Sequence, residues 1–401
     1  KLYLNGLTSD SKGIRDISFT GLSNVSSNYL EYTAEKLSPL IKSNNIELRN
    51  NAGELLVHIG KQSLKYLYKY FNNEDHDVRK FAIDTAGLIA DDEQTLQNTL
   101  NKIDDTDNNV ALSAIECSSN ILSRSPGLYS IPVHNKIISK YGEFEAGKIQ
   151  IIEGLGKIPS EHSQKFIIEK LKEEDDIFLQ ANCIDSLAYI CTDKDVCLDL
   201  FNNLDNFPEE LQTTALKATY AIAQRIGFTI AIPERNRSIA HRALKDEDPE
   251  IRAAGLLALG QIYSTKDIPY LINEIIHFNQ ETSLFIIQNI MQKCDLHFIE
   301  EFFNSLLDQI IETKDLYHYY NFFELVNIVW KDSDPERKNT LIGTLIDYYL
   351  KYSHKGIIEL LKIIYDLDRH TVFDEIEKHK DQNNYENKTK LSDLKNTIIN
   401  L

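Results

Sequence analysis

A group of basic side chains follows the longest connection between the predicted helices. Its members are Arg235, Arg237, His241, Arg242 and Lys245. Because the chain as a whole is acidic, such a cluster can hold an anionic ligand or an acidic segment of a partner protein. The alternative, which is the more common situation, is a solvated helix start whose cations form local salt bridges. The cluster is therefore a candidate anion- or partner-binding site, and the sequence leaves both interpretations open.

Aromatic residues concentrate in the C-terminal third of the chain. Rings that recur every three or four residues along a helix usually belong to the core. Two adjacent rings cannot both point inward, however, and exposed Tyr and Trp side chains often anchor contacts with partner proteins. The candidates for exposed aromatic contacts are Tyr319, Tyr320, Trp330, Tyr348 and Tyr349.

The familiar catalytic and metal-binding motifs are missing from the sequence. There is no HExxH, no Walker A loop, no GxSxG and no GxGxxG. The five cysteines include no CxxC pair, and Cys191 and Cys197 lie six residues apart, which is not a zinc spacing. The acidic runs 104–107 and 173–176 lack the central Gly and terminal Glu of a calcium loop. We therefore predict no catalytic residue, no cofactor and no metal site, and we expect the thiols to be reduced and buried.

The charge balance narrows the range of partners. The 401 residues include 43 basic and 61 acidic side chains, which gives a formal net charge of −18. A chain of this charge lacks the cationic face that binds phosphates or an anionic membrane. Nucleic acids are therefore not expected partners, and no apolar run approaches the roughly 18 residues of a membrane-spanning helix. Without a recognisable signal peptide, a cytoplasmic location is expected.

One pattern recurs along the chain at intervals of 30 to 40 residues. Its clearest copy is 248–262, where Asp248 suits a helix N-cap and Pro249 the first helical position. Ile251 serves as the anchor of this copy. Six equivalent anchors lie upstream: Leu48, Val78, Val110, Gly147, Leu179 and Leu211.

Three positions relative to the anchor carry the pattern. The residue eleven places after the anchor is Ile in all seven copies. The residue four places after it is small in six of the seven, which lets another helix approach closely, and the residue three places before it is a good N-cap in five. We therefore expect seven amphipathic anchor helices, with Ile89 and Ile190 among their core residues.

Each anchor helix is followed by a short turn and a second amphipathic stretch, for example at 63–71, 163–171 and 268–278. Neither helix can bury its apolar face alone, whereas hairpins stacked on hairpins form one continuous core. The predicted fold is all-α, a superhelical solenoid of stacked antiparallel helix hairpins. A regular repeat array is expected over residues 1–295. Irregular C-terminal helical repeats are expected to continue and cap the same solenoid over residues 296–401.

The order acid-x-x-apolar-basic within the copies resembles the HEAT-repeat family, especially its short bacterial, armadillo-like form. The residues that carry the resemblance are 75–79 (DHDVR) and 248–252 (DPEIR), with 47–49 (ELR) as a third copy. In that family the acid and the arginine typically interlock neighbouring hairpins. The basic residue is present as Arg49, Arg79, Lys148 and Arg252, and is replaced by Ala111, Gln180 and Gln212. The resemblance therefore implies a polar ladder that is interrupted at those three positions.

Three functional hypotheses follow. The resemblance and the missing catalytic motifs favour a non-catalytic scaffold or adaptor that binds a protein partner through an extended concave surface. Because the chain begins at Lys1 and contains one methionine, Met291, it is also interpreted as a fragment with covalently linked domains outside it. It is then a cytosolic regulatory module of a larger protein, such as a bacterial membrane carrier resembling nucleotide transporters. An enzyme with an unrecognised site is the third hypothesis.

Overall fold

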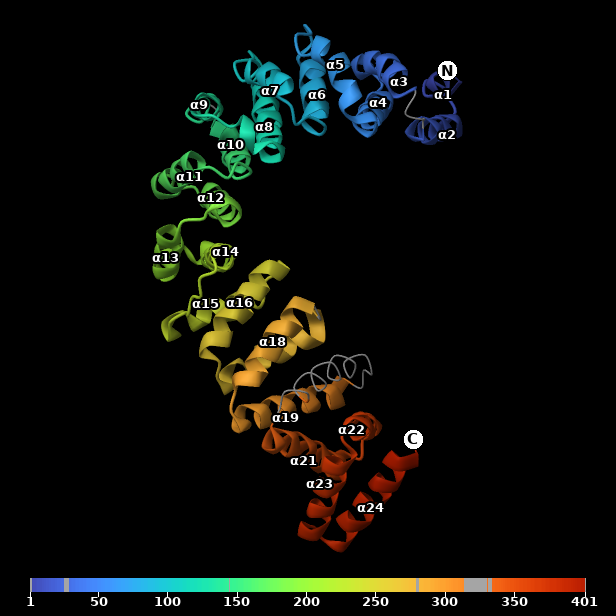
Figure 1. Ribbon diagram of the computed structural model, residues 1–401, viewed down its shortest axis with the longest axis vertical. Coiled ribbons are helices and arrows are strands. Elements are labelled where there is room, and N and C mark those ends of the chain that lie inside the picture. Colours follow the sequence, from blue (N-terminus) through green and yellow to red (C-terminus); the bar gives the residue numbers. More distant parts are fainter. Residues whose placement is uncertain are drawn as a thin grey trace. The chain divides into compact units, whose positions relative to one another are not determined.

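The computed structural model describes residues 2–24, 29–143, 145–278, 281–313, 330 and 334–400 (Figure 1). Within these ranges the regular elements are all helical. The fold is an all-α, HEAT-like solenoid, as predicted. It divides into two compact units, Lys1–Val196 (unit 1) and Cys197–Leu401 (unit 2). The division at residue 295 that the sequence suggests stays a prediction.

Unit 1 alternates anchor helices with shorter partner helices. Its helices are α1 (Leu2–Gly6), α2 (Lys12–Ser23), α3 (Leu30–Leu37), α4 (Ile46–Ile59), α5 (Leu64–Leu67), α6 (His76–Gly87), α7 (Glu93–Leu100), α8 (Asn108–Arg124), α9 (Ile131–Ile138), α10 (Lys148–Leu155), α11 (Glu161–Glu173) and α12 (Ile177–Ile190). The anchor helices of this unit are α4, α6, α8, α10 and α12.

Unit 2 continues the alternation and ends in longer helices. The helix α13 (Lys194–Asn202) contains the boundary between the units. It is followed by α14 (Glu209–Arg225), α15 (Arg237–Ala243), α16 (Pro249–Ile262), α17 (Ile268–Asn273), α18 (Glu281–Lys293), α19 (Leu296–Thr313), α21 (Pro335–Tyr352), α22 (Lys355–Leu367), α23 (Arg369–Gln382) and α24 (Tyr385–Asn400). The anchor helices predicted in this unit are α14 and α16.

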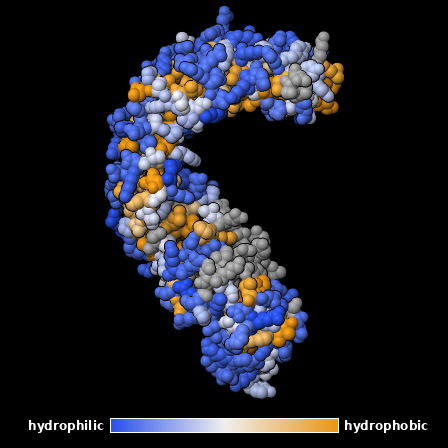
Figure 2. Space-filling view, viewed as in Figure 1, coloured by the Kyte–Doolittle hydropathy of each residue, from blue (hydrophilic) through white to orange (hydrophobic). Residues whose placement is uncertain are grey.

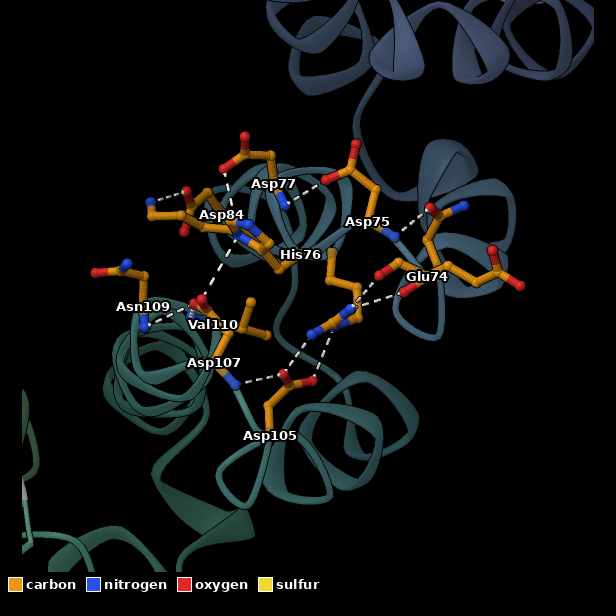
Figure 3. A network of polar contacts seen from close by, with 12 residues as sticks. Glu74, Asp75, His76, Asp77, Asp84, Asp105, Asp107, Asn109 and Val110 are labelled. Atoms are coloured by element: carbon orange, nitrogen blue, oxygen red, sulfur yellow. Dashed lines mark hydrogen bonds and ion pairs between the residues drawn. The ribbon is translucent and has the colours of Figure 1, made fainter.

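Side-chain caps begin five of the anchor helices, at the positions that the pattern predicts. Asn45 accepts a hydrogen bond from the N–H of Leu48 at 3.1 Å. Asp107 accepts from the N–H groups of Asn109 and Val110 at 2.9 and 3.1 Å (Figure 3). The other three caps are Asp75, Asp176 and Asp248. Each cap satisfies N–H groups that the first helical turn leaves without a partner.

The predicted core positions are buried with two exceptions. The residue four places after the anchor is buried in all seven helices, from Ala52 in α4 to Gly255 in α16. Eleven places after the anchor, five of the isoleucines are buried, whereas Ile89 and Ile262 are only half-buried. The prediction that Ile89 belongs to the core is therefore wrong. The helix α6 ends at Gly87, so Ile89 lies in the following turn, and Ala90 is fully buried there instead.

The partner helices pack mainly onto the anchor helix that follows them. The pairs α7–α8, α11–α12 and α15–α16 make the hairpins, whereas the sequence pattern paired each anchor helix with the stretch after it. Between α7 and α8, the buried hydroxyls of Thr99 and Ser118 are hydrogen bonded at 3.0 Å. Leu96 and Leu100 lie on the same buried side of α7, which explains why that side faces α8.

At Arg79 and Arg252, the basic residue that follows the anchor links its helix to the loop before it and to the next repeat. In α6, Arg79 donates to the carbonyl oxygens of Asn73 and Glu74 at 2.8 and 3.0 Å. It also donates to both carboxylate oxygens of Asp105, at 2.9 and 2.6 Å. Figure 3 shows Asp105 beside the capping residue Asp107, whose N–H donates to Asp105 at 3.1 Å. Such bidentate, charge-assisted contacts hold two repeats in one orientation.

The same geometry recurs at both ends of the described repeats. Arg252 donates to the carbonyl oxygens of Asp246 and Glu247, both at 2.9 Å, and pairs with Glu274 at 3.2 Å. Arg15 in α2 donates to the carbonyls of Ser9 and Asp10, and to Glu47 in the next repeat. The Arg15 copy precedes the seven that the sequence pattern identified.

The two glutamines do not fully interrupt the ladder. Gln180 donates to the carbonyl oxygen of Glu174 at 2.7 Å, and Gln212 to that of Phe207 at 2.9 Å. Gln212 also accepts a hydrogen bond from Arg242 of the following repeat. A neutral amide therefore keeps the bond to the preceding loop, and at Gln212 it keeps the link between repeats as well.

Replacing Ile190 tests the buried register. We expect Ile190→Ala to lower the free energy of unfolding by about 2–5 kcal/mol, because this side chain is 4% exposed and its loss leaves a cavity. Ile89→Ala is the matched control, and its cost should be about 1 kcal/mol or less, since the half-buried site can rehydrate. Urea titration of both variants checks this. Equal costs would contradict the assignment of the two positions.

Replacing Arg79 tests the ladder. Burial alone would raise the pKa of Asp105, but the hydrogen bonds from Arg79 and from the N–H of Asp107 outweigh it and hold this pKa below its ordinary 3.8. A carboxyl whose folded pKa is depressed stabilises the fold above its unfolded pKa and loses that contribution as pH falls. We expect Arg79→Gln to cost about 1.5–3 kcal/mol at pH 7, with the difference from wild type shrinking below pH 3.8.

Lys80→Gln in the same helix is the control for Arg79→Gln. Lys80 pairs with Asp84 at 2.6 Å, but both side chains are partly open to solvent, so its loss should cost about 0.5 kcal/mol or less. Urea titrations of the three proteins at neutral and acidic pH give the comparison. A cost for Arg79→Gln no larger than that of the control would contradict the role of the ladder.

Candidate partner-binding surfaces

The structure brings the predicted basic cluster together in unit 2. Arg235 lies in a single 3-10 turn, Glu234–Asn236, and Arg237, His241 and Arg242 lie in α15. Lys245 follows in the turn after α15. The long connection before the cluster is anchored by two buried side chains, Ile230 and Ile232. The cluster is thus built on a rigid element.

Buried Asp267 engages two of the five basic residues. Its side chain is fully buried, contacts the guanidinium of Arg237, and lies 2.7 Å from Nε2 of His241. The ring of His241 is stacked on Tyr270 at 4.0 Å. The hydrogen bond with Glu234 outweighs partial burial and, together with Asp267, raises the pKa of Arg237. Arg237 and His241 therefore compensate a buried carboxylate.

The other three basic residues also have partners within the protein. Arg235 pairs with Asp205 at 3.2 Å, and Arg242 lies 3.6 Å from Glu209. Lys245 lies 5.6 Å from the centroid of the Tyr270 ring. A shallow pocket of about 340 Å³ beside them is lined by Glu209, Glu210, Thr213, Arg242, Lys245 and Asp246. Because three of those six residues are acidic, the pocket offers an anion no uniformly positive wall. Partner binding by the cluster stays a prediction.

The structure describes three of the five aromatic residues that were predicted to be exposed. Trp330 is buried, at 4% exposure, with the Lys338 ammonium 5.0 Å from its ring, so its prediction as an exposed contact is wrong. The hydroxyl of Tyr348 donates to the carbonyl of Asn304 and to Asp308 at 2.8 and 2.9 Å. Tyr349 is half-buried, and burial raises its pKa. Tyr319 and Tyr320 lie outside the described residues.

All five cysteines are free and buried. Burial raises the pKa of Cys117, Cys183 and Cys294 to about 12, which keeps these thiols protonated and unreactive near neutral pH. In the described part of the chain, no His, Cys, Asp and Glu side chains group as metal ligands. Nor does any helix there combine the length and apolar character needed to cross a membrane.

Exposed aromatic residues on α12 and α18 were not identified from the sequence. Phe178 and Tyr189 lie eleven residues apart on one side of α12 and are 75% and 70% exposed. Phe285 in α18 is 64% exposed. In both helices an Asn four residues after the Phe, Asn182 or Asn289, donates to the carbonyl of that Phe at 2.9 Å. The sequence does contain a signal, because Phe178 stands directly before the anchor Leu179, whereas most other copies of the repeat have a polar residue at that position.

Comparison with known proteins establishes the fold only. No protein-family model and no curated protein matches the chain. Among solved structures it is similar to Kap95 in a Kap95:Nup1 complex, with 12% identity and a TM-score of 0.52 over 95% of this chain. It is also similar to a Kap95p structure with RanGDP, with 13% identity and a TM-score of 0.52 over 99% of this chain. The chain spans 56% and 66% of those two proteins.

Charge reversal separates the structural from the solvent-exposed members of the basic cluster. We expect Arg237→Glu to cost about 3–5 kcal/mol, because it leaves buried Asp267 beside a second negative charge. Arg235→Glu should change stability by about 0.5 kcal/mol or less, since its side chain is mostly exposed. Thermal unfolding of the two single variants checks this. Similar melting temperatures for both would contradict the structural role of Arg237.

Proposed function

We propose that the protein is a non-catalytic scaffold that holds a protein partner on the exposed side of its anchor helices. The proposal rests on the exposure of Phe178 and Tyr189 in α12, whose opposite side packs into the core. In α12 the buried residues include Leu179, Cys183 and Leu187. The two rings add nothing to that core and remain in water.

Large exposed rings favour association with another protein. A Phe or Tyr side chain buries a large apolar area at little conformational cost, and aromatic residues dominate the binding energy of many interfaces. Phe178 and Tyr189 lie on the same side of α12, with Asn182 and Asp185 between them. A partner that covers this side can therefore contact both rings and the polar groups between them at once.

The structural neighbours are consistent with this proposal. The two matched Kap95 structures are described as a complex with Nup1 and as a complex that changes the switch loops of RanGDP. In both, a helical solenoid binds another protein. The concave position predicted for the binding surface is part of the same proposal, as is a soluble, cytoplasmic location.

Removing the two rings tests the proposal. We expect Phe178→Ala/Tyr189→Ala to reduce the amount of specifically captured partner at least about tenfold in pull-downs from source-cell lysate. The melting temperature should stay close to that of wild type, because both side chains are exposed. Quantitative mass spectrometry of the captured proteins measures the change.

The control removes two equally exposed rings elsewhere. Tyr29 precedes α3 and Tyr385 begins α24, and they are 61% and 87% exposed. Capture by Tyr29→Ala/Tyr385→Ala should match that of the wild-type protein. If no protein is captured in stoichiometric amount by the wild-type chain, or if both double variants capture the same amount, the scaffold proposal fails.

A further inference from the structure

A row of carboxylates follows the anchor helices of unit 1. The residue six places after the anchor is acidic in each of five successive anchor helices, and in unit 2 it is Lys217 and then Leu257. The row therefore belongs to unit 1 and is not a general feature of the repeat. Its members, in chain order, are Glu54, Asp84, Glu116, Glu153 and Asp185.

The stacking of the helices brings these carboxylates into line. A Cβ added to Gly87 in α6 would lie 3.2 Å from the Cα of Cys117 in α8, and one added to Gly156 after α10 would lie 3.1 Å from the Cα of Ser186 in α12. In both cases a residue nine places after one anchor meets the residue seven places after the next. Near the starts of α6 and α8, the Nδ1 atom of His76 also lies 3.6 Å from the carboxylate of Asp107. These two helices are therefore parallel with an offset of two residues, and because the same positions meet in α10 and α12, equal positions lie in neighbouring turns.

The row lies on the side of the helices that faces away from the core. The residues four and seven places after each anchor are buried, whereas Glu54, Glu116 and Glu153 are exposed and Asp84 and Asp185 are half-buried. Within the described residues, those three glutamates form no ion pair. Asp84 pairs with Lys80 of its own helix at 2.6 Å. Aligned carboxylates repel one another, so the row contributes nothing to holding the repeats together.

Other groups on the same face suit a polypeptide ligand. Three of the five helices carry an amide three places after the anchor, which are Asn51, Gln150 and Asn182. Such amides can both donate to and accept from the backbone of an extended segment. Phe178 and Tyr189 flank the last carboxylate of the row. Hydrophilic side chains cover most of the visible surface of the molecule in Figure 2. The rings of Phe178 and Tyr189 are 75% and 70% exposed.

We propose that this face of unit 1, the carboxylate row, binds an extended basic segment of a partner protein. The inference rests on the proposed scaffold function and specifies its partner. Packed helices lie about 8–10 Å apart, and an extended segment in the polyproline II conformation advances about 3.1 Å per residue and presents every third side chain on the same face. One step along the row therefore corresponds to about three residues, so the matching segment carries Lys or Arg at every third position.

Charge complementarity favours this occupant over other cations and polymers. Carboxylates about 8–10 Å apart cannot share one metal ion, whose oxygen ligands lie about 2.3–2.6 Å away. A nucleic acid or an anionic membrane is repelled by the row. A polycation with regularly spaced charges can contact Glu54, Glu116 and Glu153, which are unpaired within the described part of the chain, at the same time.

The test measures binding of a fluorescent peptide of about 16 residues, with Lys at every third position and Gly or Ser between, by fluorescence anisotropy. The wild-type chain is compared with Glu54→Lys/Glu116→Lys/Glu153→Lys. The control is Glu93→Lys/Glu161→Lys/Glu169→Lys, which makes the same change in net charge at exposed positions of the partner helices α7 and α11. We expect the first variant to weaken binding at least about tenfold and the control less than about threefold.

Several outcomes would overturn the inference. Equal weakening by both triple variants would show that only net charge matters. A peptide of the same composition with its lysines grouped at one end should bind more weakly than the spaced peptide, and equal affinity would refute the matched spacing. No measurable binding of the spaced peptide at low salt, where such attraction is strongest, would refute the proposal directly.

Partner capture separates this inference from the proposed function. If the carboxylate-row variant captures the wild-type partner undiminished while the variant lacking Phe178 and Tyr189 does not, the scaffold function stands and the basic-segment inference fails. If the wild-type chain captures no partner, the scaffold function fails, and peptide binding alone decides whether the row recognises basic segments.

Discussion

The close, parallel stacking of the anchor helices is the constraint on which the rest of the structure depends. A larger residue does not fit at Gly87, which lies against Cys117, without a shift of the backbone. The same holds for Gly156, which lies against Ser186. Small residues four places after six of the seven anchors allow the same approach. The basic or amide side chain after the anchor bonds to the preceding loop at Arg79, Gln180, Gln212 and Arg252. The stack is thereby set in one register. With few exceptions, a position that faces the core in one repeat faces the core in the next. A position that faces solvent in one repeat likewise faces solvent in the next.

That regularity has a functional consequence. Because the helices are aligned, a residue type repeated at one solvent-facing position becomes a continuous surface feature. The carboxylates of unit 1 form such a feature, whereas the basic residues of unit 2 do not. Arg237 and His241 are directed onto Asp267, and Arg235 and Arg242 onto Asp205 and Glu209. A chain with a net charge of −18 can thus contain a basic cluster that is paired locally and an acidic row in which Glu54, Glu116 and Glu153 form no ion pair within the described residues.

Much of the fold followed from local signals in the sequence. The five side-chain caps and the burial of the small residue after the anchor depend on neighbours within one or two turns, which the sequence displays directly. What failed depended on contacts that local patterns do not encode. Ile89 was misplaced because α6 ends at Gly87, two residues before it. The pairing of Arg237 with Asp267, for example, joins residues thirty positions apart.

The carboxylate row was present in the same alignment that revealed the repeats, and it was missed for a physical reason. Catalytic and metal sites require several polar groups within a few ångströms, so a search for them favours residues that cluster in sequence or in a pocket. A binding surface on a solenoid distributes its groups at the spacing of the helices, one per repeat. Its members are therefore separated by thirty or more residues, and none is unusual by itself. Only the parallel register of the helices, which makes equal positions adjacent, turns five ordinary surface acids into one surface.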